Sequence, residues 1–226
     1  MSANKIIFPM RRRGATGAVS AVTQETIDKL NVMRSARLVS NFVYWSQTGN
    51  DGNNGTINNP VRTWARVAEL LQTGSNVVYT DGECWFESVE RLIDMNVTFI
   101  KNATSSSSSL RSRNVAGTPV PGGIVAYGRC AVAVTGLNLV LDNDSTSFFA
   151  AFNVEENGSL SLSFRNVSFF QSGTNTAVLL QRAIGGILEA EFFNSPISPI
   201  TGKVMSGVAS GANPNSTFAR FSITAA

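Results

Sequence analysis

The residues best able to do chemistry in this sequence are acidic, because the chain of 226 residues contains no histidine. The lack of histidine excludes Ser/His and Cys/His catalytic pairs and metal sites that need imidazole. Two carboxylates about 5 to 9.5 Å apart are enough to hydrolyse a glycosidic bond. Residues separated by one position share a face of a strand, about 7 Å apart, and could meet this requirement. The candidate catalytic residues of this kind are Asp142 with Asp144 and Glu189 with Glu191.

The same acidic residues also fit ordinary surface structure. Residues 142–146 have the composition of a polar turn, and Glu155 and Glu156 precede an Asn-Gly pair that favours a turn tip. Like charges along one strand are common at solvated sheet edges. We therefore predict that the chain is not an enzyme, and glycan cleavage by the paired carboxylates stays open as the alternative.

No metal or cofactor is predicted from the remaining reactive residues. Asp51 begins a Gly- and Asn-rich run that is similar to a calcium loop, but Arg62 occupies the position where such a loop needs a glutamate. The two cysteines, Cys84 and Cys130, lack the CxxC spacing of zinc and redox sites. We expect both to be buried free thiols.

The composition predicts one folded, mainly β domain. Ser, Thr, Asn and Gly account for 84 of the 226 residues, which favours turns and pleated strands over helices. No apolar run reaches the ~18 residues that span a bilayer. We therefore expect neither a membrane span nor a secretion signal.

Positive charge is concentrated at the N-terminus. The first 37 residues hold seven basic and two acidic residues, whereas the rest holds 11 basic and 13 acidic ones. Apolar anchors beside guanidinium groups suit docking on an acidic protein surface, so we predict an attachment arm. Nucleic-acid contact through this arm, or a solvated arm, are the alternatives, and the body is not expected to bind nucleic acid. The predicted attachment residues are Ile6, Ile7, Phe8, Arg11, Arg12 and Arg13.

A short helix is predicted after the arm. Thr23 is a favourable N-cap, and Glu25 lies in the first turn, where the helix dipole favours a negative charge. Ile27, Leu30 and Met33 then form a thin apolar stripe. We predict that this stripe contacts another subunit, with packing on the chain's own domain as the alternative.

A strand, a loop and a second helix are predicted next. Residues 42–46 form an apolar run, and residues 49–56 are almost all turn formers. Pro60 opens a helical pattern and Gly74 takes the C′ position, so a capping helix is expected near residues 61–72. The residues that recur at helical spacing are Trp64, Val67, Ala68 and Leu71.

The later part of the chain contains loose repeats. Residues 132–139 match residues 162–169 at an offset of 30, residues 169–172 match 192–195 at 23, and residues 96–100 match 166–170 at 70. Repeats of about 20 to 30 residues with short strand pairs are what a β-solenoid requires. A sandwich or jelly roll of short strands is the alternative. The pattern assigns no element to residues 84–94, and the serine run 105–109 is expected to be a solvated insertion.

The segment from Tyr44-Trp45-Ser46 through residues 49–56 (GNDGNNGT) to residues 59–64 (NPVRTW) resembles the start of many right-handed parallel β-helix proteins of the pectate-lyase-like superfamily. In those proteins, a Gly/Asn/Asp-rich loop leads to a proline-started helix that covers one end of the solenoid. Bacteriophage tailspikes and fibres commonly use this design. The resemblance implies a homotrimer with a separate N-terminal virion-binding piece.

These observations combine into one prediction. The fold would be mainly β: a short right-handed parallel β-helix, trimeric, with an N-terminal extended arm and one or two short α-helices. Residues 1–40 would form the arm and neck, and residues 41–226 the body. The predicted function is a non-enzymatic structural protein of a bacteriophage virion, as a fibre, spike or capsid decoration. Its partners would be other copies of itself and another virion protein, with a host surface glycan as a further candidate.

Overall fold

The computed structural model describes residues 40–114, 123–143, 150–172, 178–197, 203–205 and 219–224. These residues are mainly β, with one short helix. Every pairing between their named strands is parallel. None of the helices in these ranges has the length and apolarity needed to cross a lipid bilayer.

The elements follow one another along the chain in a fixed order. They are β1 (Asn41–Ser46), α2 (Trp64–Leu70), β2 (Gly74–Phe86), β3 (Val89–Ile93), β4 (Met95–Lys101), β5 (Ser108–Asn114), β6 (Gly123–Tyr127), β7 (Arg129–Thr135), β8 (Asn138–Asn143), β9 (Ala150–Val154), β10 (Ser159–Arg165), β11 (Ser168–Ser172), β12 (Val178–Arg182), β13 (Ile187–Phe193), β14 (Lys203–Met205) and β15 (Ala219–Thr224). Residues 84–94, which the sequence pattern left unassigned, form the end of β2 and all of β3.

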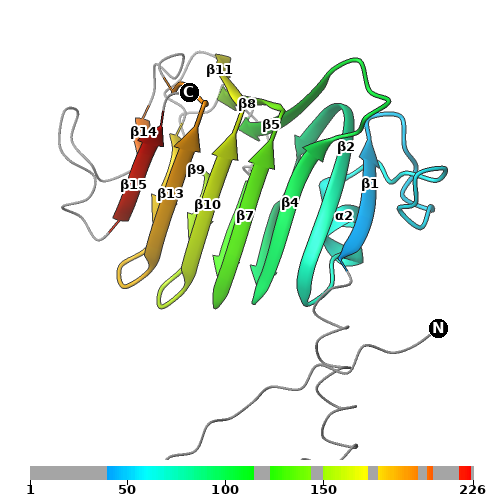
Figure 1. Cartoon of the computed structure of the whole chain (residues 1–226). Helices are drawn as coiled ribbons and strands as arrows, with labels where there is room; N and C mark the ends of the chain where they lie inside the picture. Colours follow the sequence, from blue (N-terminus) through cyan, green and yellow to red (C-terminus); the bar gives the residue numbers. More distant parts are fainter. Residues whose placement is uncertain are drawn as a thin grey trace, which may run out of the picture. The chain divides into compact units, whose positions relative to one another are not determined.

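The strands form three parallel sheets. Sheet 1 contains β1, β2, β4, β7, β10, β13 and β15 in spatial order, and Figure 1 shows them side by side. Sheet 2 contains the second half of β2, then β5, β8 and β11, and sheet 3 contains β3, β6, β9, β12 and β14. The long strand β2 passes from sheet 1 to sheet 2, since Thr80 pairs with Lys101 and Gly82 pairs with Ser108. From β2 to β13 the chain therefore passes from sheet 1 to sheet 2 to sheet 3 and back to sheet 1, so that each sheet gains one parallel strand per coil. After β13, the described strands β14 and β15 belong to sheets 3 and 1.

The register confirms one predicted repeat and corrects two. Val132 pairs with Leu162, and Leu139 pairs with Phe169, which is the predicted offset of 30. Phe192 pairs with Phe164 in sheet 1, so its predicted equivalence with Phe169 at an offset of 23 is wrong. The offset of 70 is also wrong, because residue 97 aligns with 132 and 162. The parallel pairing excludes an antiparallel sandwich or jelly roll for the described strands.

The core lies between the sheets and is built from rows of inward side chains. One row crosses four strands of sheet 1 through Phe99, Val134, Phe164 and Phe192, which are all fully buried. The rings of Phe164 and Phe192 stack with centroids 5.0 Å apart. Burying one large apolar side chain contributes about 1.5–3 kcal/mol to the free energy of folding. Because each such side chain packs on the side chain at the same position of the next coil, this contribution depends on both coils.

The helix caps the first coil, but its bounds differ from the prediction. It begins at Trp64, with Thr63 as N-cap, and not at Pro60, because Val61 remains extended and pairs with the edge strand β1. It ends at Leu70, and Gly74 starts β2 and is not a C′ residue. Trp64 is fully buried and packs on Trp45, with ring centroids 5.5 Å apart. The helix and the loop before it therefore cover the apolar end of the stack.

Candidate functional site

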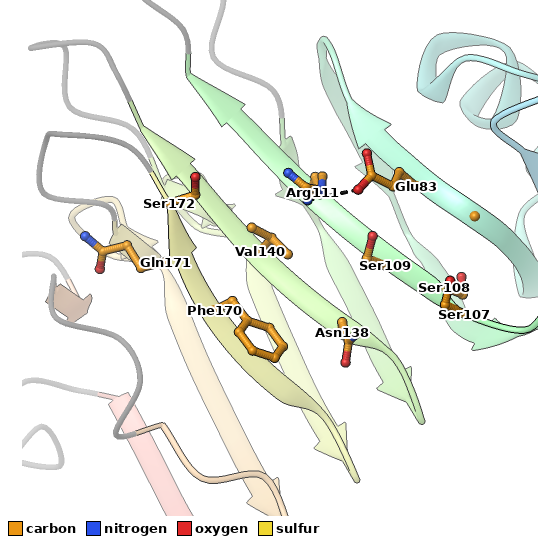
Figure 2. Close-up of a pocket in the computed structure, with 11 residues that line it drawn as sticks. Glu83, Ser107, Ser108, Ser109, Arg111, Asn138, Val140, Phe170, Gln171 and Ser172 are labelled. Atoms are coloured by element: carbon orange, nitrogen blue, oxygen red, sulfur yellow. Dashed lines mark ion pairs between the residues drawn. The ribbon is translucent and has the colours of Figure 1, made fainter.

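A groove on the outer face of sheet 2 is the best candidate site that the described residues form. It encloses about 380 Å³, which lies within the usual size of small-molecule sites. Four neighbouring strands, β2, β5, β8 and β11, contribute to its floor, as Figure 2 shows. Its lining residues are Gly82, Glu83, Ser107, Ser108, Ser109, Arg111, Asn138, Val140, Phe170, Gln171 and Ser172.

Strand alternation decides which side chains line the groove. Cys84, Leu110, Leu139 and Phe169 pair in register and are buried in the core. Their neighbours in sequence point outward, because successive side chains of a strand face opposite sides. The outward residues form two rows across sheet 2, namely Glu83, Ser109, Asn138 and Ser168, and then Trp85, Arg111, Val140 and Phe170.

Arg111 organises the charged end of the groove. Its Nη2 atom lies 2.9 Å from Oε1 of Glu83, and its Nη1 atom lies 3.8 Å from Oδ2 of Asp142. Its guanidinium carbon lies 4.9 Å from the ring centroid of Trp85, which is a cation–π distance. The Nε atom is buried and makes no hydrogen bond among the described residues. Two carboxylates and an indole ring thus hold the guanidinium in a fixed position.

The opposite end of the groove is fixed by a buried hydroxyl pair. Ser108 Oγ donates to Thr80 Oγ1 at 2.7 Å, and the Thr80 hydroxyl donates to the carbonyl of Ile100 at 3.3 Å. The solvated insertion predicted for residues 105–109 is therefore wrong at its C-terminal end. Ser108 and Ser109 belong to β5, and the Ser108 side chain is buried because it faces the core where β2 changes sheets.

The groove combines an apolar floor with a polar rim. Phe170 is 48% exposed and lies beside Val140, whereas Asn138, Ser109 and Glu83 of the neighbouring row contribute amide, hydroxyl and carboxylate groups. Figure 2 shows Phe170 and Asn138 at one side of the floor, with the Glu83–Arg111 ion pair at the other. A ligand ring with an apolar face and hydroxyl groups at its edge would match this arrangement.

The predicted catalytic carboxylates lie in different sheets. Asp142 is in sheet 2 near the groove, and Asp144 lies outside the described residues. Glu189 and Glu191 share the outward face of β13 in sheet 1, as their spacing predicts. Glu191 Oε2 lies 3.6 Å from Nη2 of Arg165. The described residues therefore place Asp142 apart from the β13 pair.

Asp51, which begins the run similar to a calcium loop, organises the capping loop. Its Oδ1 atom accepts hydrogen bonds from the backbone N–H groups of Arg62 and Thr63, both at 2.9 Å. Partial burial acts to raise the pKa of Asp51, but the hydrogen bonds from Thr63 and Arg62 outweigh it and hold that pKa below its ordinary value of 3.8. The described residues contain no cluster of three or more metal-binding side chains.

The two cysteines are buried and free, which confirms their prediction. Burial raises the pKa of the Cys84 thiol to about 12; a backbone hydrogen bond with Asp81 opposes this shift, and the nearby Asp81 carboxylate adds to it. The Cys84 thiol also donates to the carbonyl of Trp45 at 3.5 Å. The thiolate, which is the reactive form, is therefore strongly disfavoured at position 84.

The predicted attachment and oligomer residues lie outside the described residues. These are Ile6, Ile7, Phe8, Arg11, Arg12 and Arg13 of the arm, and Ile27, Leu30 and Met33 of the helix. The sequence analysis missed Glu83 and Phe170, which line the groove, and Trp85, which packs against Arg111. In each of the four strands, an outward polar residue is followed two positions later by a larger outward residue. This pattern can be recognised only when the register between the coils is known.

Comparison with known proteins gives little further information. No protein-family model matches the chain, and no curated protein matches its sequence. Among solved structures, a rhamnogalacturonan lyase is similar with a TM-score of 0.48 and 14% sequence identity, over 82% of this chain and 50% of the lyase. The chain therefore spans about half the length of that lyase. A likeness of this size carries no argument about activity.

Proposed function

We propose that this chain is a non-enzymatic structural protein of a bacteriophage virion. Its body would be a right-handed parallel β-helix that forms a homotrimer, and its N-terminal arm would dock on another virion protein. The observation that supports this proposal best is the continuous stack of parallel coils, in which inward rows such as Phe99, Phe164 and Phe192 support one another. Such a stack resists deformation along its length, which suits a fibre, spike or decoration.

The positions of the acidic residues also support a structural role. Asp142 and Glu191 each have an arginine partner, Arg111 and Arg165 respectively. Ion pairs between carboxylates and arginines are common on protein surfaces and do not by themselves indicate a catalytic role. Glycan cleavage remains the alternative, and it requires that Asp142→Asn or Glu189→Gln abolish turnover. Incubation with bacterial surface polysaccharides, followed by measurement of new reducing ends, should show no turnover by the full chain.

The groove on sheet 2 supports a host-surface saccharide as an additional partner. Phe170 offers an apolar surface for the C–H face of a sugar ring, and Asn138, Ser109 and Glu83 offer hydrogen-bonding groups at its edge. Phe170→Ala should weaken binding to an array of bacterial surface glycans at least tenfold. Ile57→Ala, which removes a side chain with 55% exposure from a loop away from the groove, should leave binding unchanged. Equal binding by both variants would exclude the groove as the saccharide site.

The arm provides the direct test of the virion role. Deletion of residues 1–20 should leave a β-rich circular dichroism spectrum, because the described core begins after residue 40. The shortened chain should no longer be incorporated into particles, as measured by quantitative mass spectrometry of purified virions. Incorporation of the shortened chain at the full-length level would contradict docking through the arm.

A further inference from the structure

The lining that the described residues give to the groove on sheet 2 contains one pair of opposite charges. Glu83 and Arg111 are its two charged members, and they form an ion pair with 2.9 Å between Oε1 and Nη2. The other lining residues are small, apolar or uncharged polar. A ligand that enters the groove therefore meets charges that are already paired with each other.

The charged groups near the lining are also partnered. The register places Arg113 opposite Asp142 on the next outward row of sheet 2. Asp142 Oδ2 lies 3.8 Å from Nη1 of Arg111, which is within ion-pair distance but too long for a hydrogen bond. Lys101 donates from Nζ to the carbonyl of Ser106 at 3.1 Å, outside the lining. Each of these positive groups thus has an oxygen partner or an acidic neighbour.

The Arg111 guanidinium offers little to a negatively charged ligand. Glu83 occupies its Nη2 atom, its Nε atom is buried, and the Trp85 ring centroid lies 4.9 Å from its central carbon. A ligand carboxylate would have to displace Glu83, which would leave that charge unpaired beside the ligand. The side chains of Arg111 and Glu83 are 24% and 45% exposed, so the carboxylate is the charge that an incoming ligand meets first.

From this pairing we infer that the groove selects uncharged saccharides and rejects acidic ones, such as chains that contain uronic acids. This inference rests on the proposed saccharide partner and names the chemical class that the same site accepts. The Glu83 carboxylate accepts hydrogen bonds from sugar hydroxyl groups, whereas it repels a second carboxylate. The ionised group of an acidic sugar would also lose its hydration without gaining a partner of opposite charge.

The selection acts on a chain of sugars and not on a single ring. Phe170 on β11 and Arg111 on β5 lie on the same outward row, two strands apart, which is a separation of about 10 Å. A ring stacked on Phe170 reaches Asn138 and Val140 of the intervening strand β8. The next ring of a chain that runs across the strands would lie over the ion pair between Glu83 and Arg111. An acidic group on that second ring is the one that the pair excludes.

Glycan arrays with matched charges test the inference. Each acidic bacterial surface polysaccharide is placed on the array in its native form and after carbodiimide-activated borohydride reduction. The reduction converts the carboxylates to alcohols and leaves the rings and linkages intact. The full chain should bind the reduced form about fivefold more tightly than the native form. Binding of the reduced form should change less than about twofold between 50 and 500 mM salt, because no ion pair with the ligand forms.

Glu83→Gln gives a second readout. This substitution keeps an acceptor oxygen, removes the negative charge and frees one edge of Arg111. Binding of native acidic polysaccharides should rise about fivefold, and binding of the reduced forms should stay within about twofold. Glu156→Gln is the matched control, because Glu156 is exposed in the turn between β9 of sheet 3 and β10 of sheet 1. The control should leave both affinities unchanged.

The outcomes separate the inference from the proposed function. If native acidic polysaccharides bind as tightly as their reduced forms and Phe170→Ala weakens this binding, the charge selection is overturned and the saccharide site stands. Glu83→Gln with an unchanged preference would also overturn the charge selection. Absence of binding to every glycan, in either form, would overturn both the saccharide partner and this inference.

Discussion

Gly128 lies directly before β7 and beside Asp94 of the previous coil, and the two residues form the corner between sheets 3 and 1. A Cβ atom at position 128 would lie 2.2 Å from Oδ1 of Asp94, and Gly128 has a φ of +65°. The same Oδ1 atom accepts a hydrogen bond from the backbone N–H of Arg129 at 2.8 Å. The corner therefore requires both a left-handed residue and a residue without a side chain.

Gly128→Ala should destabilise the protein by about 2–4 kcal/mol, measured as the free energy of unfolding in urea. About 1–2 kcal/mol comes from the left-handed backbone, and the rest from displacement of Asp94 and loss of its hydrogen bond. Gly136→Ala is the matched control, because Gly136 has a φ of +64° and no atom within 4 Å of a Cβ. An equal loss in both variants would show that the contact with Asp94 has no effect.

Phe164→Ala should cost about 3–5 kcal/mol of unfolding free energy, because its fully buried ring contacts coils on both sides. Phe170→Ala, six residues later and on the outer face, should cost less than about 1 kcal/mol. Chemical denaturation of the two variants measures this difference. Similar losses would contradict the assignment of inward and outward faces.

The hydrogen bonds to Asp51 predict a dependence of stability on pH. The pKa of Asp51 is lowered in the folded protein, so its contribution is present above its ordinary pKa of 3.8 and is lost as the pH falls through the lower folded value. Asp51→Asn keeps an acceptor but removes the ionisation. The difference in unfolding free energy between wild type and this variant should therefore shrink as the pH falls below 4. A difference that stays constant from pH 7 to pH 3 would contradict the assigned role of the Asp51 carboxylate.

Cys84 and Cys130 should not react with a thiol reagent such as dithionitrobenzoate at pH 8 in the native state. Both are buried, and the pKa of Cys84 is raised to about 12. Two thiols per chain should appear after unfolding in guanidinium. Rapid reaction of either thiol in the folded protein would mean that the stack opens locally.

The sequence predicted the kind of fold better than its register. Inward positions must be apolar in every coil, so the match of residues 132–139 with 162–169 could be recognised. The matches at offsets of 23 and 70 were misleading because each equates a strand of sheet 1 with a strand of sheet 2. Phe169 and Phe192 look equivalent in sequence, yet they occupy sheets 2 and 1. Local patterns do not encode which sheet a strand joins.

The groove could not be derived from local patterns for the same reason. Glu83, Arg111 and Phe170 come together only because strands separated by some 30 residues stack in register. The helix bounds also depended on a tertiary contact. Val61 pairs with β1, and this extended pairing delays the helix that Pro60 would otherwise begin.

Cryo-electron microscopy of the virion that carries this protein tests the central claim most directly. The account predicts threefold density for three parallel stacks in particles with the full chain, and loss of that density when residues 1–20 are deleted. Particles without any such density when the full chain is expressed, or with unchanged density after the deletion, would contradict it.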